Sequence, residues 1–450
     1  MAETTSDTQT NPEYPSLGAA NYALGLLFIA YVLSFIDRQI LSLLVGPIRA
    51  QFGISDFEYS LLQGAAFAVL YTFAGLPLGR LADRFSRKWV IAASVLFWSL
   101  ATCACGTART FWQLFTARMA VGAGEAGLAP AAYSMITDSY APKHFGYAMA
   151  FYKSAVQIGA ASALILGGFL IDFYTQLGPI ELPLMGSLQP WQATLVTVGL
   201  PGLLLSGLLL SIHEPSRKGL VASHGGQLQL PVRTIVTFLW RRKRTYLSLF
   251  LGSSMLAMAG YGSAAWYPEF FVRTYGMSRS EAGSSYGSIV LISGALGVML
   301  GPWIVNRLAR RHADAYVRAI IYTSLLAVLP AVLAPLMQDQ FLTLLLLVPA
   351  TGFGAAYLGV MAAAFQPITP NQMRGQTTAI YIFVTNIIGM AVGTSVLAAF
   401  TDFLYQDDNA LHYSIATANA LFYPAAIVMF IYCLKGYRRS VDEIGQWSLD

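Results

Sequence analysis

The stretch GRLADRFSRK, residues 79–88, decides the fold, because a weaker copy of it, PWIVNRLARR, occurs at residues 302–311. Each copy follows an apolar run, and each ends in a pair of basic residues. APKHFG at 141–146 and TPNQMRG at 369–375 are a second pair of similar stretches. Both pairs repeat at roughly half the chain length. Membrane transporters are commonly built from such internal repeats, so the sequence predicts two related halves.

The composition indicates a protein that crosses a membrane many times. Of the 450 residues, 56% are hydrophobic and only 11% are charged, whereas a soluble domain carries about 25% charged residues. The charge is too sparse to cover a water-facing surface. We therefore predict a polytopic membrane protein.

The apolar runs predict twelve transmembrane helices, since about 20 apolar residues cross the hydrocarbon core. The fold class is thus all-α, with two pseudo-symmetric six-helix bundles. The expected spans are residues 19–45, 57–81, 88–108, 111–137, 145–173, 190–212, 245–272, 280–306, 315–337, 340–366, 373–402 and 411–435.

The polar segments divide the chain into five parts. Residues 1–18 contain no Lys or Arg, so we expect a disordered cytoplasmic tail rather than a cleaved signal peptide. The longest polar stretch separates the bundles, and its residues 231–241 could form an amphipathic surface helix. The expected parts are a tail at 1–18, a bundle at 19–212, a linker at 213–244, a bundle at 245–437 and a tail at 438–450.

The basic residues predict the orientation. In the twelve-span arrangement, twenty Lys and Arg fall on the side of the termini and four on the other side, with three inside spans. The positive-inside rule then places both termini in the cytoplasm. This placement also accounts for the net charge of +5, so no nucleic-acid partner is expected.

Five of the charged residues inside the expected spans are candidates for function: Asp37, Arg38, Arg118, Glu125 and Lys153. Each charge at bilayer depth costs about 2.5–3.5 kcal/mol, so these side chains should face the protein interior, paired or hydrated. Asp37 and Arg38 point about 100° apart on a helix, so a direct bridge between them is not expected. Asp37 in span one and Arg118 in span four lie at similar depths in the membrane, which instead suggests contact between these two residues.

The roles of these charges divide into structural and functional alternatives. Arg118 and Glu125 share a helix face and could form a purely structural ion pair, or a titrating carboxylate beside a substrate-binding cation. Lys153 could approach Glu125 or extend to the cytoplasmic face. Arg38 could bind a substrate anion or only steady span one. If Asp37 binds a proton in one conformation and releases it in another, it couples transport to protons. The proton is the only coupling ion that we expect, with no cofactor.

Seven aromatic or polar residues within spans are candidates for the cavity lining, although such residues also serve as packing or as interfacial anchors. The three cysteines and five histidines form no metal-spaced group, so no metal site is expected. The candidate lining residues are Tyr147, Tyr152, Tyr261, Trp266, Tyr357, Tyr381 and Asn386.

GRLADRFSRK resembles the loop signature of the major facilitator superfamily, G-x-L-A-D-[RK]-x-G-[RK]-[RK], with Ser86 where the family prefers Gly. Arg118, Gly122 and Gly124 resemble the R-x-x-x-G-x-G element of span four. FIDRQ at 35–39 and GEAG at 124–127 resemble the spinster branch, most of all its bacterial members. The resemblance extends over residues 19–437 and implies a bacterial plasma (inner) membrane protein.

The resemblance implies a gating role for the loop, in which Asp83 contacts a helix end or an Arg and latches one conformation. The alternative is that the basic residues only anchor the loop. The gating candidates are Gly79, Asp83, Arg84, Arg87 and Lys88. The resemblance further implies transport of a lysophospholipid or sphingoid phosphate, often linked to protons. The antiporter signature of span five is poorly matched at Gly159-Ala160, which leaves the direction open.

The leading hypothesis is a monomeric, proton-coupled secondary transporter of an amphipathic anionic lipid. A transporter of small organic anions or lipophilic drugs is the alternative within this class. No catalytic motif suggests a membrane enzyme, and no G-x-x-x-x-G-K-[ST] suggests an ATP-driven pump. Paired halves argue against a channel. A membrane sensor that only binds lipid stays open.

Overall fold

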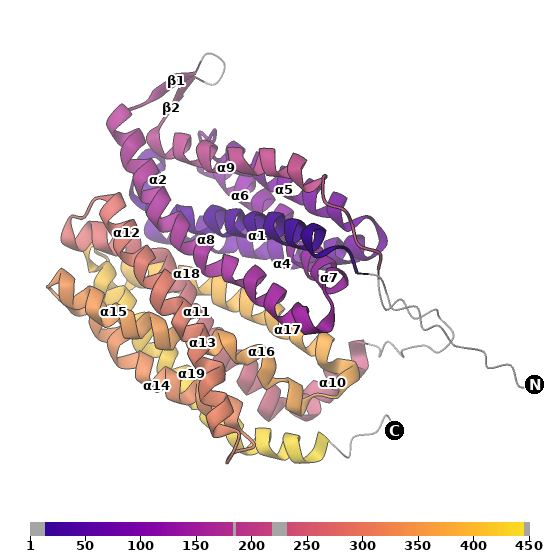
Figure 1. Ribbon diagram of the computed structural model, residues 1–450. Helices are drawn as coiled ribbons and strands as arrows, with labels where there is room; N and C mark the ends of the chain where they lie inside the picture. Colours follow the sequence, from indigo (N-terminus) through magenta and orange to yellow (C-terminus); the bar gives the residue numbers. More distant parts are fainter. Residues whose placement is uncertain (1–13, 183–185, 218–231, 445–450) are drawn as a thin grey trace, which may run out of the picture.

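The computed structural model describes residues 14–182, 186–217 and 232–444. The helices fall into two groups that follow the sequence, with α1 to α9 on one side and α11 to α19 on the other (Figure 1). The two expected bundles are thus present, and the all-α fold class is confirmed. The expected tail 1–18 lies mostly outside the described residues, as do residues 218–231 of the linker.

Within the described residues, the N-terminal half contains nine α-helices, one 3-10 segment and a hairpin. Its elements are α1 (Leu17–Gln39), the 3-10 helix η1 (Ile40–Leu43), α2 (Val45–Phe52), α3 (Asp56–Gln63), α4 (Ala65–Arg84), α5 (Arg87–Cys105), α6 (Phe111–Glu125), α7 (Leu128–Ser139), α8 (Pro142–Leu177), β1 (Ile180–Leu182), β2 (Gly186–Leu188) and α9 (Pro190–Leu209).

The C-terminal half follows the surface helix α10 (Val232–Arg241) and is interrupted more often. Its elements are α11 (Lys243–Tyr275), α12 (Arg279–Ile289), the π-helix η2 (Val290–Gly294), α13 (Ala295–Leu308), α14 (Ala315–Leu333), η3 (Ala334–Leu336), α15 (Gln340–Ala355), η4 (Ala356–Gly359), α16 (Met361–Ala364), η5 (Gln366–Ile368), η6 (Asn371–Met373), α17 (Arg374–Thr385), the π-helix η7 (Asn386–Val392), α18 (Gly393–Ala399), the π-helix η8 (Phe400–Tyr405), η9 (Asp408–Ala410) and α19 (Leu411–Glu443).

Ten helical stretches of the described chain are long and apolar enough to cross a membrane. The two other expected spans are also helical but depart from this pattern. Span four is divided into α6 and α7, of 15 and 12 residues. Span seven corresponds to α11, whose 33 residues are long enough but include many polar side chains. The twelve-span arrangement therefore fits the fold, with one span broken and one unusually polar.

Two local features differ from the expectation, and a third agrees with it. β1 and β2 pair as a short antiparallel hairpin between α8 and α9, which the apolar pattern did not indicate. α19 continues to Glu443, so the first residues of the expected 438–450 tail are helical. α10 occupies most of the stretch in which an amphipathic helix was expected.

The two halves are joined by polar contacts near one end only. We call the end that holds Leu17, Arg84 and Glu443 the inner end, and the end that holds Asp56 and Asp408 the outer end. Within the described chain, every hydrogen bond and ion pair between the halves involves residues 39–63 or 172 of the N-terminal half. The interface is therefore closed at its outer end.

Close packing of backbones reinforces this closure. A Cβ on Gly168 would lie 2.6 Å from the carbonyl oxygen of Arg279, and one on Gly283 would lie 2.1 Å from that of Leu164. Both glycines stand where α8 meets α12. Small residues allow membrane helices of the two halves to approach closely.

Candidate functional site

A buried polar cluster lies where α1 meets α6, in the interior of the N-terminal half. Arg38 donates a hydrogen bond from Nε to Oε2 of Glu125 at 2.6 Å. The hydroxyl of Ser34, one turn earlier on α1, donates to the same oxygen at 2.5 Å. The Glu125 side chain is fully buried and that of Arg38 is 14% exposed. Arg38, which had no assigned partner from the sequence, is thus paired with Glu125.

The expected contact between Asp37 and Arg118 has a different form. Nη1 of Arg118 donates to the backbone carbonyl of Asp37 at 3.2 Å, and no ion pair joins the two side chains. Asp37 lies in the last turn of α1, where carbonyl groups lack regular helical partners and accept side-chain donors. The two spans therefore meet as expected, but the carboxylate does not make the contact.

Several groups of this cluster have spare hydrogen-bonding capacity. Oδ1 of Asp37, Oε1 of Glu125, and Nε and Nη2 of Arg118 are buried without a hydrogen-bond partner in the described chain. Asp37, Arg118 and Glu125 are all at most 3% exposed. Unsatisfied charged groups are costly at such depth, so this arrangement is suited to rearrangement or ligand binding.

Aromatic rings enclose the guanidinium group of Arg38. Its Cζ lies 4.9, 4.7 and 4.5 Å from the ring centroids of Phe35, Phe67 and Tyr71. Phe67 also lies 5.6 Å from Cζ of Arg118. Rings within about 6 Å attract a cation through their quadrupole, which helps to retain both arginines inside the bundle.

The helices that carry the cluster are interrupted beside it. α1 changes to the 3-10 segment η1 directly after Gln39, and α6 ends at Glu125 before α7 begins at Leu128. In the C-terminal half, Tyr357 lies in η4 and Asn386 begins the π-helix η7. Discontinuous helices and π-segments are frequent at transporter and other functional sites.

The glycines of span four explain how the cluster is assembled. A Cβ on Gly122 would lie 2.4 Å from the carbonyl oxygen of Phe67 on α4, and one on Gly124 would lie 2.9 Å from the backbone nitrogen of Trp98 on α5. Only glycine permits these approaches. The R-x-x-x-G-x-G element therefore brings Arg118 and Glu125 against the neighbouring helices.

Lys153 lies apart from Glu125. Its Nζ is 5.9 Å from the ring centroid of Tyr133, and the described chain provides it with no ion pair. Tyr133 in turn packs edge-on against Tyr152, with centroids 5.7 Å apart, and Tyr152 stacks on Tyr31 at 4.7 Å. The approach of Lys153 to Glu125 is thus not observed, and Lys153 belongs to an aromatic cluster beside the site.

The remaining lining candidates separate by exposure. Tyr147 is 81% exposed and lines a cavity of about 510 Å³ between α1 and α8 near the inner end. Tyr261 of α11 is 40% exposed. Trp266 is fully buried, and its Nε1 donates to the carbonyl of Thr394 at 3.2 Å.

Tyr152, Tyr357 and Tyr381 are also buried, and Asn386 is partly buried. Tyr381 packs against Phe365 with ring centroids 5.1 Å apart. Among the candidates, Tyr147 and Tyr261 are therefore the two that present an exposed ring.

The loop motif joins elements within the N-terminal half. Arg87 is buried; it contacts Asp138 of α7 through Nη1 and donates from Nε to Glu214 at 3.2 Å. Glu214 also accepts from the backbone nitrogen of Arg87 at 2.8 Å and contacts Ser86. Lys88 reaches the carbonyls at the end of α9 at 3.4 Å.

The other loop candidates are free of such contacts in this conformation. Asp83 and Arg84 are exposed, and neither forms a hydrogen bond or ion pair with the described residues. A Cβ on Gly79 would meet only Pro130, at 3.9 Å. The latching role of Asp83 therefore stays a prediction that concerns a different conformation.

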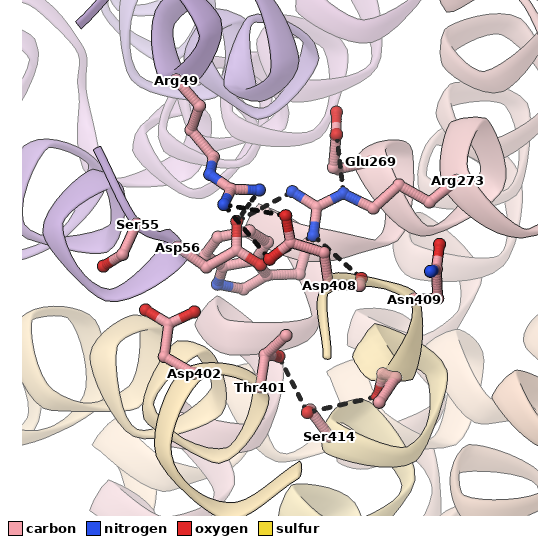
Figure 2. Close-up of polar contacts among 12 residues, drawn as sticks. Arg49, Ser55, Asp56, Glu269, Arg273, Thr401, Asp402, Asp408, Asn409 and Ser414 are labelled. Carbon is pink, nitrogen blue, oxygen red and sulfur yellow. Dashed lines mark hydrogen bonds and ion pairs between the residues drawn. The ribbon is translucent and has the colours of Figure 1, made fainter. Parts of the chain in front are cut away.

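At the outer end, charged residues of both halves form one network (Figure 2). Arg273 of α11 holds Asp56 of α3 at 2.7 Å, and Arg49 of α2 holds Asp408 at 3.0 Å. Arg49 also contacts Asp56 at 3.0 Å, and Glu269 contacts Arg273 at 2.9 Å. Asp56 is fully buried between two arginines from different halves, so it is the central residue of this network.

Three carboxylates here lie close enough together to suggest a cation site. One oxygen from each of Asp56, Asp402 and Asp408 falls within 4.8 Å of the others. However, Arg49 and Arg273 already neutralise Asp56 and Asp408, and Asp402 accepts from the backbone nitrogen of Phe57 at 2.7 Å. All three carboxylates therefore already have partners within the protein.

Comparison with known proteins identifies the class. The model of the Major Facilitator Superfamily matches residues 27–394, so the chain belongs to this family of membrane transporters rather than to the enzymes. The fold, the broken helices and the polar cluster described above agree with that assignment.

Individual relatives place the chain on the spinster branch. It is 29% identical over 94% of both chains to an MFS-type efflux pump of Mycolicibacterium smegmatis. It is 25% identical to the sphingosine-1-phosphate transporter SPNS2 of Danio rerio, over 65% of this chain and 58% of that protein. A crystal structure of a bacterial homolog of the human lysosomal transporter Spinster, inward-facing and unoccupied, matches with a TM-score of 0.78, 26% identity, and coverage of 97% and 100%.

Sequence reasoning missed two groups of residues. Ser34 and the rings of Tyr31, Phe67 and Tyr71 surround the cluster, but such residues are common in any membrane helix. The outer network was missed because Arg49 and Arg273 were considered only for orientation. A signal was available in the sequence, because acidic and basic residues occur together in the short loops at the ends of spans one, two, seven and eleven.

Proposed function

We propose that this spinster-type transporter works by alternating access, couples transport to protons, and moves an amphipathic anionic lipid such as a lysophospholipid or a sphingoid phosphate. The observation that carries the proposal is the buried cluster of Asp37, Arg38, Arg118 and Glu125 beside interrupted helices. The proposal includes a bacterial inner membrane location with both termini in the cytoplasm, supported by the excess of basic residues at the inner end.

Asp37 is the proposed proton carrier. In this conformation its Oδ1 is buried without a partner among the residues that the structure describes, and none of them forms an ion pair with its carboxylate. A neutral carboxyl group is compatible with such a position, whereas an ion there requires compensation. Arg118 has two unused guanidinium nitrogens next to it. A small shift between α1 and α6 would pair the two side chains and release the proton.

Arg38 is the proposed contact for the anionic head of the substrate. Its only described carboxylate partner is Glu125, and its guanidinium is partly exposed within a ring of aromatic side chains. A phosphate would compete with Glu125 for the planar donor fork of Arg38. The lipid tail would extend toward the inner end, where apolar side chains such as Phe73 and Leu76 of α4 are exposed.

A second candidate is export of lipophilic compounds. The full-length similarity to the M. smegmatis efflux pump favours it, and the aromatic residues around the cluster suit an apolar ligand. The two candidates differ in their need for an anion contact, because a phosphate head requires Arg38 and a lipophilic dye does not.

Transport in proteoliposomes with an imposed pH gradient tests the proposal. The substrates are a lysophospholipid, a sphingoid phosphate, a dicarboxylate and a cationic dye, and Asp37→Asn is the control. We expect lipid movement that depends on the gradient and is lost in Asp37→Asn. Movement of the dye or the dicarboxylate without lipid movement would overturn the substrate assignment. Binding of lipid without counterflow would indicate a sensor.

A further inference from the structure

A second ligand site lies outside the polar cluster, at the inner end of the C-terminal half. A cavity of about 890 Å³ is enclosed by α10, the start of α11 and the end of α19. None of its lining residues belongs to the N-terminal half, so the cavity is separate from the interface between the halves. Six of its lining residues are basic: Arg233, Arg241, Arg242, Arg244, Lys435 and Arg439.

The cavity has a large excess of positive charge. Glu443 is its single acidic lining residue, and it contacts Arg439 at 2.5 Å and Arg242 at 3.5 Å. The other four cations have no carboxylate within ion-pair distance in the part of the chain that the structure describes. Nε of Arg242 is also buried without a hydrogen-bond partner. The cavity is therefore suited to an anion with several oxygen acceptors.

The position of the cavity is that of a lipid headgroup. α10 buries Ile235 and Phe238 against the protein, and Trp240 on its surface is 67% exposed. Exposed tryptophans on amphipathic helices mark the boundary between headgroups and acyl chains. The exposed Trp240 therefore favours a cavity opening at the depth of the membrane phosphates.

An apolar strip continues from the cavity toward the hydrocarbon core. Arg244 stacks on Tyr432, with Cζ 4.3 Å from the ring centroid. On α19, Ile431 directly precedes Tyr432 and is 53% exposed, and Val428, one turn before Tyr432, is 61% exposed. Leu247 of α11 is 48% exposed. A soluble anion has no apolar part that would contact this strip, whereas the acyl chains of a phospholipid would cover it.

From these observations we propose that the cavity between α10, α11 and α19 binds the phosphate headgroup of an anionic membrane phospholipid. The lipid connects α10, which precedes the C-terminal half, to the end of α19. This bound lipid is a resident of the cytoplasmic leaflet and is distinct from the transported substrate, whose proposed contact is Arg38.

Native mass spectrometry on the purified, delipidated full chain tests this proposal. The probes are dioleoyl phosphatidylglycerol, dioleoyl phosphatidylcholine and glycerol 3-phosphate. Each cation near a membrane surface strengthens anionic lipid binding roughly fivefold, so we expect phosphatidylglycerol to bind at least about tenfold more tightly than phosphatidylcholine. Glycerol 3-phosphate should not displace the lipid at concentrations similar to that of the lipid.

The variants separate the site from general surface charge. The triple change Arg233→Gln, Arg244→Gln and Lys435→Gln should abolish the preference for phosphatidylglycerol, and the triple change Arg233→Lys, Arg244→Lys and Lys435→Arg should keep it. The matched control is Arg310→Gln with Arg311→Gln, two exposed cations at the same end, which should also keep it.

If the triple glutamine variant does not fold, Arg233→Gln alone replaces it, because this side chain is exposed on α10; we expect a loss of roughly fivefold. The proposal is wrong if the glutamine variants keep the wild-type preference, or if the control loses it equally. It is also wrong if glycerol 3-phosphate competes as well as the lipid, since the site would then serve a soluble anion.

Discussion

The outer and inner ends of the molecule use ion pairs in opposite ways. At the outer end, Arg273 and Asp408 of the C-terminal half hold Asp56 and Arg49 of the N-terminal half (Figure 2). At the inner end, the described ion pairs stay within one half: Arg87 binds Glu214, and Asp314 binds Arg438. Charges at the outer end therefore select a conformation, whereas those at the inner end stabilise each bundle.

At the inner end, each half has an ion pair that joins its third and sixth membrane spans, and the positions of the acidic and basic partners are exchanged between the halves. In both halves a carboxylate lies at the N-terminus of the third span, α5 or α14, where the helix dipole favours it. In the C-terminal half it is Asp314, which holds Arg318 at 2.7 Å and Arg438 at 2.6 Å. In the N-terminal half it is Glu214, brought from beyond α9. The carboxylate of this ion pair can thus come from the start of the third span or from the segment after the sixth span.

The largest effect should come from Asp56→Asn at the outer end. The change leaves Arg49 and Arg273 facing each other without the carboxylate, and breaking a buried pair costs about 3–5 kcal/mol. We expect the closed outer end to open and transport to fall by at least about tenfold, since each 1.4 kcal/mol shifts a population tenfold. Distances between spin labels at Ala50→Cys and Tyr413→Cys, in a chain with its three cysteines replaced, measure the opening.

The control for this change is Asp408→Asn, because the Asp408 side chain is 58% exposed and exposed pairs contribute about 0–1 kcal/mol. An unchanged label distance in Asp56→Asn, or an equal change in both variants, would show that the network does not hold the halves together.

A smaller effect on stability, with no change of conformation, is expected for Arg87→Gln. The variant leaves Asp138 and Glu214 without their shared cation, which should lower the free energy of unfolding by about 2–3 kcal/mol. Thermal unfolding of the solubilised protein measures this loss. Lys88→Gln is the control, since the two hydrogen bonds of Lys88 to the described residues are long, at 3.4 Å. A shift of the label distances in Arg87→Gln would contradict the assignment of Arg87 to a joint within one half.

Asp83→Asn should have a still smaller and opposite effect on conformation. Asp83 has no hydrogen bond or ion pair with the described residues here, so the conformation that is closed at the outer end should lose nothing. If Asp83 latches the alternative conformation, that state should lose roughly 1 kcal/mol, and transport should fall several-fold. Labels at Lys143→Cys and Gln372→Cys at the inner end measure the shift. A shift toward closure of the inner end would exclude the latch.

The smallest effect concerns pH. Partial burial raises the pKa of Glu214, but hydrogen bonds from Ser86 and Arg87 outweigh it and hold the pKa below its usual value. The pKa of Asp314 is likewise lowered: partial burial raises it, and hydrogen bonds from Arg438 and Arg318 outweigh that rise. A lowered carboxyl pKa stabilises the fold above the unfolded pKa of about 4, and this stabilisation is lost as the pH falls through the folded pKa.

The midpoint temperature of unfolding, measured between pH 7 and about pH 3, should therefore fall steeply at the acid end. The fall is expected there because the carboxyl groups of Glu214 and Asp314 have pKa values of about 4 in the unfolded chain. Glu214→Gln should show a lower midpoint at pH 7 and a flatter decline. A decline in Glu214→Gln as steep as in the wild type would remove Glu214 from this explanation.

The sequence predicted the architecture well because apolar length and charge placement follow directly from membrane physics. The repeat of GRLADRFSRK correctly indicated two halves. It aligned Arg87 with Arg310, however, and the structure gives no such equivalence, since Arg87 is buried and Arg310 is exposed. The C-terminal counterpart of the Arg87 joint is Asp314, which a residue-by-residue alignment cannot find.

The polar cluster was only partly predictable. Helix geometry correctly excluded a direct bridge between Asp37 and Arg38, and it predicted the contact between α1 and α6. It could not choose the partners, because these depend on rotations of the two helices and on the breaks after Gln39 and Glu125. Glu125 was therefore paired with Arg118 or Lys153 in the sequence hypotheses, whereas its partners are Arg38 and Ser34.

The most direct test of the account asks whether a proton on Asp37 selects the conformation. Distances between labels at the outer end and at the inner end are measured at acid and alkaline pH, in the wild type and in Asp37→Asn. We expect acid pH to favour the conformation closed at the outer end, because Asp37 is unpaired there and neutral when protonated. Alkaline pH should favour pairing with Arg118 and opening. Asp37→Asn should stay closed at the outer end at both pH values. A variant that keeps the wild-type pH response would contradict the proposed role of Asp37 as the proton carrier.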